Sequence, residues 1–473
     1  MIWPALRCCA VLLTLIATAS CSLAPYTARP LDQDAAIAEY TQRSATTDGL
    51  ERFAIANGYA ESAWPPPLWG LRELTLVALY FHPDMRIARA RADLARAQRD
   101  SAGARADIGA RVRPEYHGRE LPEDNGPWTL GLELEIPLAS QGKRNARIER
   151  GAFLVDAADI DVAVAAWGAR ARVRDGFIGL QSDREDLAAL TAQIAARREV
   201  LALIERRVQA GMLSSHELGA ERLALSQLEI SRDQKFSQTQ RRLADLALAL
   251  GVPQEVAATM ELRFDAQPSV AQTDSAALRR LALRNRLDVH RKLLEFGAAD
   301  AEVKLAVALQ NPDITLGPGY TWDQGDNVWS LAVGFSVPAG ARTKAQIRES
   351  EAQREVAAQQ FLATQMAAIA STEAAAAGYR SALEHLASAR RQLSLQKEQE
   401  ARVVRQFDAG SADRLQRVTA RVESLAMDGA VRLAETQMRL ALSRLEDAVQ
   451  KPMFGDFFEL PDMRSAKRDD ASR

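Results

Sequence analysis

The sequence repeats itself once, with a period of about 200 residues. Two stretches that each begin with tryptophan and alternate apolar with polar residues, 128–138 and 329–338, lie this far apart. So do the glycines Gly211 and Gly410, each of which follows an alanine. Order and spacing are kept together, and the period is too long for one unit of a solenoid. The sequence therefore indicates a duplicated half-protein, and any fold must accommodate the same plan twice.

Each half is predicted to contain a helix, a pair of strands, a very long helix and a return helix. Alanine, arginine, leucine, glutamate and glutamine dominate outside the strands, a composition typical of long helices. In the first half, residues 71–250, we expect helix 71–106, strands 108–117 and 128–138, helix 139–208 and helix 215–250. In the second half, residues 276–450, we expect helix 276–309, strands 314–322 and 329–338, helix 340–407 and helix 412–449. The predicted fold class is mainly α with a small β part.

The connecting segments carry local signals. Gly211 and Gly410 suit the left-handed conformation that ends a helix. Ser214 and Glu217 have the spacing of a capping box, and Ser411 can cap the equivalent return helix. Residues 21–70 are rich in proline and turn residues, so we expect an extended strap there, while 251–275 form a linker and 451–473 a C-terminal tail.

Helix lengths constrain the geometry. A helix of about 70 residues is roughly 105 Å long at 1.5 Å per residue. The first helix and the return helix of one half, at about 36 residues each, can therefore lie end to end beside the long helix. Apolar residues at three- and four-residue steps between 187 and 208 follow a coiled-coil pattern. An ordinary amphipathic bundle would explain the apolar stripes but not helices of this length.

The N-terminus reads as a secretory signal over residues 1–20. Arg7 precedes a short apolar run and then small residues, and the run is too short to span a membrane. Residues 18–21 resemble a bacterial lipobox, in which Cys21 would be lipidated, although Thr18 departs from the usual leucine. Cleavage by ordinary signal peptidase after 17–19 stays an alternative. No later window offers the roughly 20 apolar residues of a membrane-spanning helix.

The four strands alternate, and each has about the ten residues of a tilted membrane strand. One face is apolar, and its hairpin-turn ends carry the aromatic residues expected of an interfacial girdle: Tyr116, Trp128, Tyr320, Trp322 and Trp329. The other face is polar, so we expect it to be hydrated, and it carries the candidate lumen residues: Arg111, Arg113, Glu115, Glu133 and Glu135. A soluble sheet packed on the helices would also alternate, and it stays an alternative at this point.

Four strands cannot close a barrel, and open edges cannot lie in lipid because their backbone groups would be unpaired. Known membrane barrels begin at eight strands. Three copies would supply twelve strands, continuous with a tube of twelve helices. We therefore expect a homotrimer in which one sheet face contacts lipid and the other lines a water-filled channel.

Composition and spacing exclude other functions. A net charge of −2 leaves no basic surface for nucleic acid. The three cysteines, Cys8, Cys9 and Cys21, all lie at the N-terminus, so the body has no disulfide framework, zinc–cysteine site or catalytic thiol. The five histidines are scattered without ligand spacing. We expect no enzyme activity, no metal site and no cofactor.

Several segments resemble the TolC-type outer membrane factors, the outer membrane efflux protein family. The resemblance lies in 21–30 (CSLAPYTARP), 135–148 (EIPLASQGKRNARI), 311–338 and the paired Ala-Gly turns, and it covers essentially the whole mature chain. The Gly-Pro-Gly-Tyr run at 317–320 with the following Asp-Gln-Gly-Asp-Asn is most similar to the members that serve heavy-metal cation pumps. The chain departs from the family at Thr18 and over 339–345.

The resemblance implies a trimeric, twelve-stranded outer-membrane β-barrel continuous with a periplasmic coiled-coil tunnel in a Gram-negative bacterium. It implies a passive exit duct that works with a periplasmic adaptor and an inner-membrane pump of the resistance–nodulation–division (RND) type. It also implies that Asp408 and Asp413 are candidates for the periplasmic gate, and that Gly211 and Gly410 mark adaptor-docking turns. The alternative is that Asp408 is simply solvent-exposed and that Asp413 is a charge at the N-terminus of a helix. A multidrug or type I secretion duct, and a periplasmic structural or adaptor protein, are the alternatives. The sequence identifies neither the exported compound nor the cognate pump.

Overall fold

The computed structural model describes residues 26–60, 63–118, 127–138, 141–264, 274–336, 338 and 340–453. The expected signal segment, Cys21 and most of the C-terminal tail lie outside these residues. The chain divides into two compact units, residues 1–43 and 44–473. The described part of the first unit contains helix α2 (Gln33–Thr41), whose first amides donate to the carboxylate of Asp32.

The expectation of an extended strap over 21–70 is wrong. Its described part contains two helices, α2 in the first unit and α3 (Asp48–Ala56) in the second. The prolines of this segment lie outside both helices, at 25 and 30 before α2 and at 65–67 after α3. The helical segments themselves carry acidic residues in their first turns, which favours helix formation. Leu50 and Ala54 of α3 are fully buried, so this segment contributes to the core.

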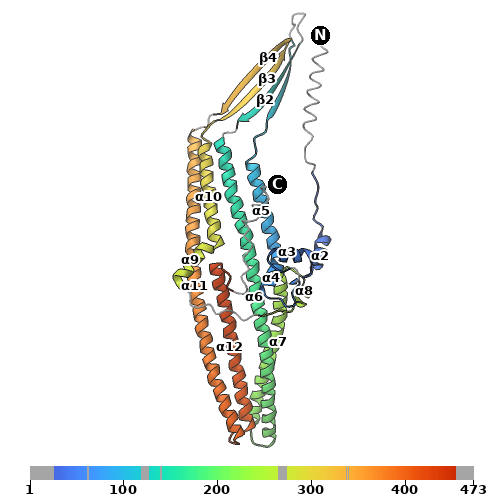
Figure 1. The fold of residues 1–473 in the computed structure, drawn as a ribbon, viewed down its shortest axis with the longest axis vertical. Helices are drawn as coiled ribbons and strands as arrows, with labels where there is room; N and C mark the ends of the chain where they lie inside the picture. The colour runs from blue at the N-terminus through green and yellow to red at the C-terminus, as the bar shows by residue number, and fades with distance from the viewer. Residues whose placement is uncertain are drawn as a thin grey trace. The chain divides into compact units, whose positions relative to one another are not determined.

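The second unit is built from long helices (Figure 1). The first half contains α4 (Leu71–Phe81), α5 (Pro83–Ala102), α6 (Gln141–Gln209), α7 (Ser215–Leu250) and the short α8 (Gln254–Ala258). The second half contains α9 (Ser275–Asn285), α10 (Leu287–Ala308), α11 (Gly340–Asp408) and α12 (Arg414–Val449). α5 and α7 pack along α6, and α10 and α12 pack along both α6 and α11. The two shorter helices of each half thus accompany the long helix, as the lengths suggested.

The first helix of each half is broken, where the sequence suggested one continuous helix over 71–106 and over 276–309. The chain is extended at His82, between α4 and α5, and at Arg286, between α9 and α10. Pro83 explains the first break, because proline lacks an amide hydrogen and disfavours a helical residue before it. The second break has no proline; there the amide of Leu287 donates to the side chain of Gln450, the residue that follows α12, at 2.6 Å.

The strands form one antiparallel sheet in the order β1 (Gly109–Tyr116), β2 (Trp128–Leu138), β3 (Asp313–Asp323) and β4 (Asp326–Ser336). β4 begins three residues earlier than expected because the hairpin turn is short, with Gln324 and Gly325 both at positive φ. Within the described chain, the outer edges of β1 and β4 pair with no other strand. The sheet is therefore open on both sides.

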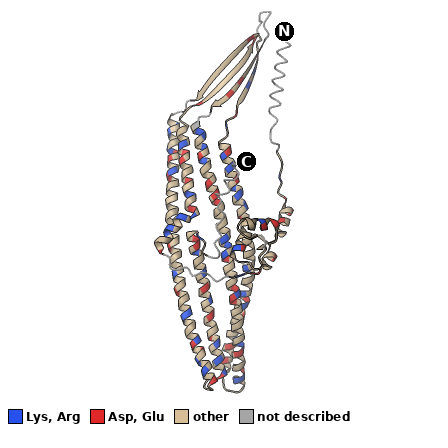
Figure 2. Ribbon diagram, in the orientation of Figure 1, with Lys and Arg blue, Asp and Glu red and all other residues tan. Residues whose placement is uncertain are grey.

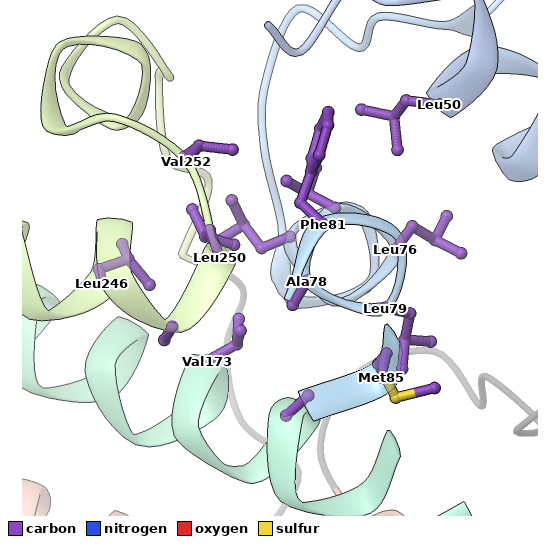
Figure 3. Packing of buried hydrophobic residues seen from close by; sticks show 14 of the residues in the cluster. Leu50, Leu76, Ala78, Leu79, Phe81, Met85, Val173, Leu246, Leu250 and Val252 are labelled. Carbon is purple, nitrogen blue, oxygen red and sulfur yellow. The ribbon is translucent and has the colours of Figure 1, made fainter. Parts of the chain in front are cut away.

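The largest apolar core lies where α4, α6 and α7 meet (Figure 3). It contains Phe81 of α4, Val173 of α6 and Leu250 of α7, each at most 4% exposed. The expected linker over 251–275 contains, in its described part, α8 and a parallel β-bridge from Leu262 to Trp69. Among the described helices, none combines the length and apolarity needed to cross a membrane. Charged side chains occur all along the helices, whereas few lie on the strands (Figure 2).

Candidate functional site

The register of the sheet aligns like faces across the strands. Arg111 lies opposite Glu133, and the next pair in the ladder is Val112 opposite Leu132. Leu132 in turn lies opposite Tyr320 of β3. Because side chains alternate along a strand, one face of all four strands is apolar and the other is polar. The sheet thus has two chemically different surfaces.

The five candidate lumen residues lie together on the polar face. Arg111 contacts Glu133 at 3.4 Å and Glu135 at 3.5 Å, and Arg113 contacts Glu115 at 3.8 Å. These side chains are all more than one-third exposed, so the pairs are weak and remain available to solvent. On the β3–β4 half, the same face carries mostly glycine, serine and threonine. The charges of the polar face therefore lie mainly on β1 and β2, and Asp313, Asp323 and Asp326 lie at the ends of β3 and β4.

The candidate girdle residues lie near the β1–β2 and β3–β4 turns. Tyr116 and Trp128 are cross-strand partners with ring centroids 5.1 Å apart, and Tyr320 and Trp329 are partners at 4.8 Å. Trp322 lies one pleat further along β3, opposite Leu130. Tyr116, Trp128 and Trp329 are each more than half exposed, whereas Tyr320 and Trp322 are half-buried, so none of the five rings is buried in a core of the single chain.

Below the sheet, Lys143 in the first turn of α6 is only 4% exposed. Its Nζ donates to the backbone oxygen of Asn311 at 2.8 Å and to Oδ1 of Asp313 at 2.7 Å. Lys143 therefore joins the long helix to the α10–β3 connection. Sequence reasoning missed this residue, because its partners are about 170 positions away along the chain.

At the opposite ends of the long helices, two similar turns carry the candidate docking glycines. Gly211 has φ +72° and Gly410 has φ +74°, and open space surrounds the position of a Cβ at each. In both turns the residue after the glycine donates its amide back to a carbonyl of the last helical turn: Met212 to Arg207 and Ser411 to Gln406. Both glycines thus end a helix in the left-handed conformation, a state that favours glycine.

Asp413 is held by two kinds of contact. It is the N-cap of α12, where Oδ1 accepts the amide of Gln416 at 2.8 Å, and its Oδ2 accepts from Arg207 of α6 at 2.8 Å. The backbone hydrogen bond from Gln416, followed by the interaction with Arg207, lowers the pKa of Asp413 below its ordinary value. Asp413 is therefore ionised at neutral pH and connects the two hairpin tips. The expectation that Ser411 caps this helix is wrong; its hydroxyl donates to Gln406 instead.

Asp408, the other gate candidate, is the last residue of α11 and is exposed. Among the described residues, no ion pair to its carboxylate occurs. Sequence reasoning missed Arg207, the partner of Asp413, since only the fold brings the end of α6 beside the start of α12. Within the described chain, no three histidine, cysteine or acidic side chains are grouped as metal ligands.

Two long helices that run from a two-faced, open sheet to exposed tip turns define a channel subunit. The sequence matches the family described as outer membrane efflux protein over residues 77–252 and 278–449, and the chain belongs to this family. It is accordingly a protein of the Gram-negative outer membrane, with a large helical portion in the periplasm. The expected family and localisation are confirmed, as is the mainly helical fold with a small antiparallel sheet.

Solved structures show the same fold. The outer membrane protein VceC of Vibrio cholerae is 20% identical with a TM-score of 0.67, and the match covers 82% of this chain and 97% of that one. The CmeC outer membrane channel of Campylobacter jejuni is 15% identical with a TM-score of 0.66, covering 96% and 98%. CusC is 16% identical with a TM-score of 0.64, covering 91% and 99%. No curated protein sequence matches the chain significantly.

Proposed function

We propose that three copies of this chain form a passive exit duct, with a twelve-stranded barrel in the outer membrane and a coiled-coil tunnel of helices below it. The observation that carries the proposal is the four-stranded sheet with two unpaired edges and two chemically different faces. Unpaired backbone groups are costly in lipid, so the edges require partners of the same kind. Closure by further copies satisfies them.

In this assembly the apolar face contacts lipid and the charged face lines the lumen. Tyr116, Trp128, Tyr320, Trp322 and Trp329 would form a girdle at one membrane interface, where amphipathic rings are favoured. Arg111, Arg113, Glu115, Glu133 and Glu135 would line the water-filled channel. The exposure of Tyr116, Trp128 and Trp329, and of the charged side chains of the polar face, supports this arrangement.

The assignment of faces can be tested with two adjacent positions on β2. Leu132→Arg places a charge on the proposed lipid face and should cost about 2–4 kcal/mol near the bilayer midplane. Glu133→Arg, its matched control, changes a residue of the polar face and should leave assembly intact. We would compare heat-resistant trimers in outer-membrane fractions and conductance in planar bilayers. Equal effects of the two variants, or a water-soluble single chain without pore activity, would reject the duct.

The partners we propose are a periplasmic adaptor and an RND-type inner-membrane pump. The turns at Gly211 and Gly410 are the proposed docking points, because they are exposed and have open space around them. Replacing either glycine with valine adds a bulky side chain at a positive φ, which strains the turn. Loss of adaptor pull-down with retained trimers would support docking there, and unchanged pull-down would count against it.

We further propose that Asp408 and Asp413 form the periplasmic gate. The ion pair between Asp413 and Arg207 fastens the start of α12 to the end of α6, so it can hold the tip closed. Arg207→Ala should raise single-channel conductance by freeing α12, and Asp408→Ala combined with Asp413→Ala should do so as well. The conservative Arg207→Lys keeps the charge and serves as the control. Unchanged conductance in the alanine variants would reject the gate assignment.

Heavy-metal cations are the substrate class that we propose for the duct. On the polar face, three glutamates outnumber two arginines, and Asp323 and Asp326 add negative charge at the hairpin end. Acidic rings favour cations in channels. Reversal potentials in a salt gradient should show cation selectivity that decreases in Glu133→Gln with Glu135→Gln. Deletion of the gene should sensitise cells to metal salts; sensitivity to drugs alone would favour the multidrug alternative.

A further inference from the structure

The first turn of α6 carries two cationic residues that hold different neighbours. Lys143 binds the α10–β3 connection through Asn311 and Asp313. Arg144, the next residue, donates from Nε to the backbone oxygen of Gly103, at the end of α5, at 2.7 Å. The start of α6 is therefore held on two sides. The end of α5, which precedes the β1–β2 hairpin, lies on one side, and the connection from α10 to the β3–β4 hairpin lies on the other.

The second half keeps only one of these two residues. Lys344 follows Pro338 by the same six residues that separate Lys143 from Pro137, and the position of Arg144 is occupied by Ala345. The side chain of Lys344 is exposed, and no hydrogen bond or ion pair of its Nζ occurs within the described chain. β3 lies beside β2, whereas no described strand lies beyond β4, so the described chain lacks the neighbour that Lys344 should bind.

The chain itself contains the missing neighbour. The repeat aligns Pro318 and Tyr320 of β3 with Pro114 and Tyr116 of β1, so the α10–β3 connection corresponds to the α5–β1 connection. In this alignment Asn311 corresponds to Asp107 and Asp313 corresponds to Gly109, so each connection offers one carboxylate, two residues apart in the alignment. Asp107 is exposed, and no partner of its carboxylate occurs within the described residues. An unpaired lysine beside one open edge is thus complemented by an unpaired aspartate beside the other.

We propose that Lys344 of one copy binds the α5–β1 connection of the next copy at Asp107, and so repeats between copies the contact that Lys143 makes within the chain. This inference rests on the proposed closed assembly and identifies the residues that fasten its subunits. A lysine that meets both a carboxylate and a backbone oxygen makes charge-assisted hydrogen bonds, which are stronger than neutral ones. The joint lies just below the barrel, where the sheet meets the helices.

The same correspondence sets the register of β4 on β1 of the next copy. Leu132 lies opposite Tyr320 within the chain. The repeat replaces Leu132 by Val333 and Tyr320 by Tyr116, so Val333 of one copy should lie opposite Tyr116 of the next. Both residues belong to the apolar face, and the register therefore continues both faces around the barrel. A slip of one residue would place Arg113 and Glu115 opposite apolar residues.

Charge reversal tests the Lys344–Asp107 joint in the full-length membrane protein. Lys344→Glu and Asp107→Lys should each decrease the fraction of trimer that survives heating in detergent by about tenfold, as expected for loss of a charged hydrogen bond. The double variant Lys344→Glu/Asp107→Lys should recover most of the trimer, because the charges are complementary again. Arg348→Glu, one helical turn along α11 and also exposed, is the matched control and should retain the wild-type trimer.

Cysteine pairs test the register. Val333→Cys with Tyr116→Cys should give covalently linked subunits on oxidation, whereas Val333→Cys with Pro114→Cys and each single cysteine variant should not. This inference would be overturned if the Lys344→Glu variant formed trimers as stable as those of the wild type, or if only the Val333–Pro114 cysteine pair became linked. Either result would leave the proposed duct function unaffected. A wild-type protein that forms no trimer and no pore would instead overturn the proposed function.

Discussion

The two halves of the chain meet α6 near its middle at two junctions that correspond in the repeat but differ in chemistry. In the first junction (residues 71–85 and 246–252), the last turn of α7 packs its apolar residues against α4 and α6 (Figure 3). In the second junction (residues 275–288 and 442–450), the last turn of α12 presents Glu446 to α6. The residue at the position of Glu446 in the first junction is Ala247.

The second junction contains a buried network of ions. Glu446 is fully buried and accepts from Arg170 and from Arg174, the latter at 2.9 Å. Arg174 also donates to Asp447 at 2.7 Å, and the indole of Trp167 donates to the same carboxylate. Burial alone would lower the pKa of Arg174, but the hydrogen bond to Asp447 and the charges of the neighbouring acids raise it above its ordinary value. Arg174 therefore keeps its positive charge at the centre of the network.

The comparison shows that two junctions at corresponding positions of a repeat can be stabilised by different kinds of interaction. Apolar contact is non-directional, so the first junction gains stability from buried area without specifying one rotation of α7. Charge-assisted hydrogen bonds fix distance and direction, although the cost of desolvating the ions offsets much of their stabilisation. We interpret the second junction as the one that sets the rotation and height of α12 on α6.

The largest expected effect follows from breaking the network. Glu446→Ala leaves Arg170 and Arg174 buried without their shared acceptor and should lower the free energy of unfolding by about 3–5 kcal/mol. Urea titration of the helical circular-dichroism signal in detergent measures this. Asp447→Ala removes a carboxylate that is 38% exposed and should cost less. Equal costs would contradict the special position of Glu446. Replacing Glu446, Arg170 and Arg174 together by apolar residues should be nearly neutral.

A smaller effect is expected in the apolar junction. Leu250→Ala creates a cavity beside Phe81 and should cost about 2–4 kcal/mol. The corresponding Val449→Ala in the second junction removes one methylene less and should cost about 1 kcal/mol less. Both side chains are fully buried, so their exposure does not explain a difference. The same titration compares them, and a larger cost for Val449→Ala would contradict the view that the first junction depends more on apolar packing.

Smaller again is the effect of the residues that end the two return helices. Gly251 has φ +73°, and a Cβ there would lie 3.0 Å from the carbonyl carbon of Phe81, so Gly251→Ala should cost at least about 1–2 kcal/mol. Gln450 has φ +47° and accepts the amide of Leu287. Gln450→Gly relieves backbone strain but loses this hydrogen bond, so we expect a change within about 0.5 kcal/mol. A large loss would show that the Gln450 hydrogen bond dominates.

The smallest effect concerns pH. Burial, and then the charge of Arg172, lower the pKa of His82 below its ordinary 6.5, while Asp84 opposes the shift. The unfolded chain binds a proton at His82 before the folded chain does, so the His82 contribution is complete above about pH 6.5 and decreases as the pH falls toward the folded pKa. His82→Asn keeps a capping acceptor and should reduce the loss of stability between pH 7 and about pH 5.5. An unchanged pH dependence in this variant would exclude His82 as its source.

Features that depend on neighbouring residues could be predicted from the sequence. α7 spans Ser215–Leu250, the bounds that the sequence suggested, because Ser214 and Glu217 cap its start and Gly251 ends it. β2 spans Trp128–Leu138, since strict alternation specifies both its faces and its length. The open sheet, from which the assembly was inferred, follows from the number of strands alone.

Features that depend on residues distant in the sequence could not be predicted from it. The break at Arg286 lacks a proline and depends on Gln450, which follows it by more than 160 residues. Asp413 caps α12 because Gln416 completes a capping box with it, whereas the hydroxyl of Ser411 donates to the backbone oxygen of Gln406 within the turn. Arg207 and Lys143 have no local signal, since their partners are brought close only by the packing of helices around α6. The sequence therefore predicted the two carboxylates of the candidate gate, Asp408 and Asp413, but not Arg207, the cation that pairs with Asp413.

The two long helices α6 and α11 have the same length, 69 residues each. An insertion of one residue in either would raise its tip by about 1.5 Å and rotate it by about 100°. The two turns would then differ in height and aim, and a partner that grips both at once would lose one of them. Length changes in this protein are therefore expected to be tolerated only when both helices change together and by whole heptads, which keep a side chain on nearly the same face.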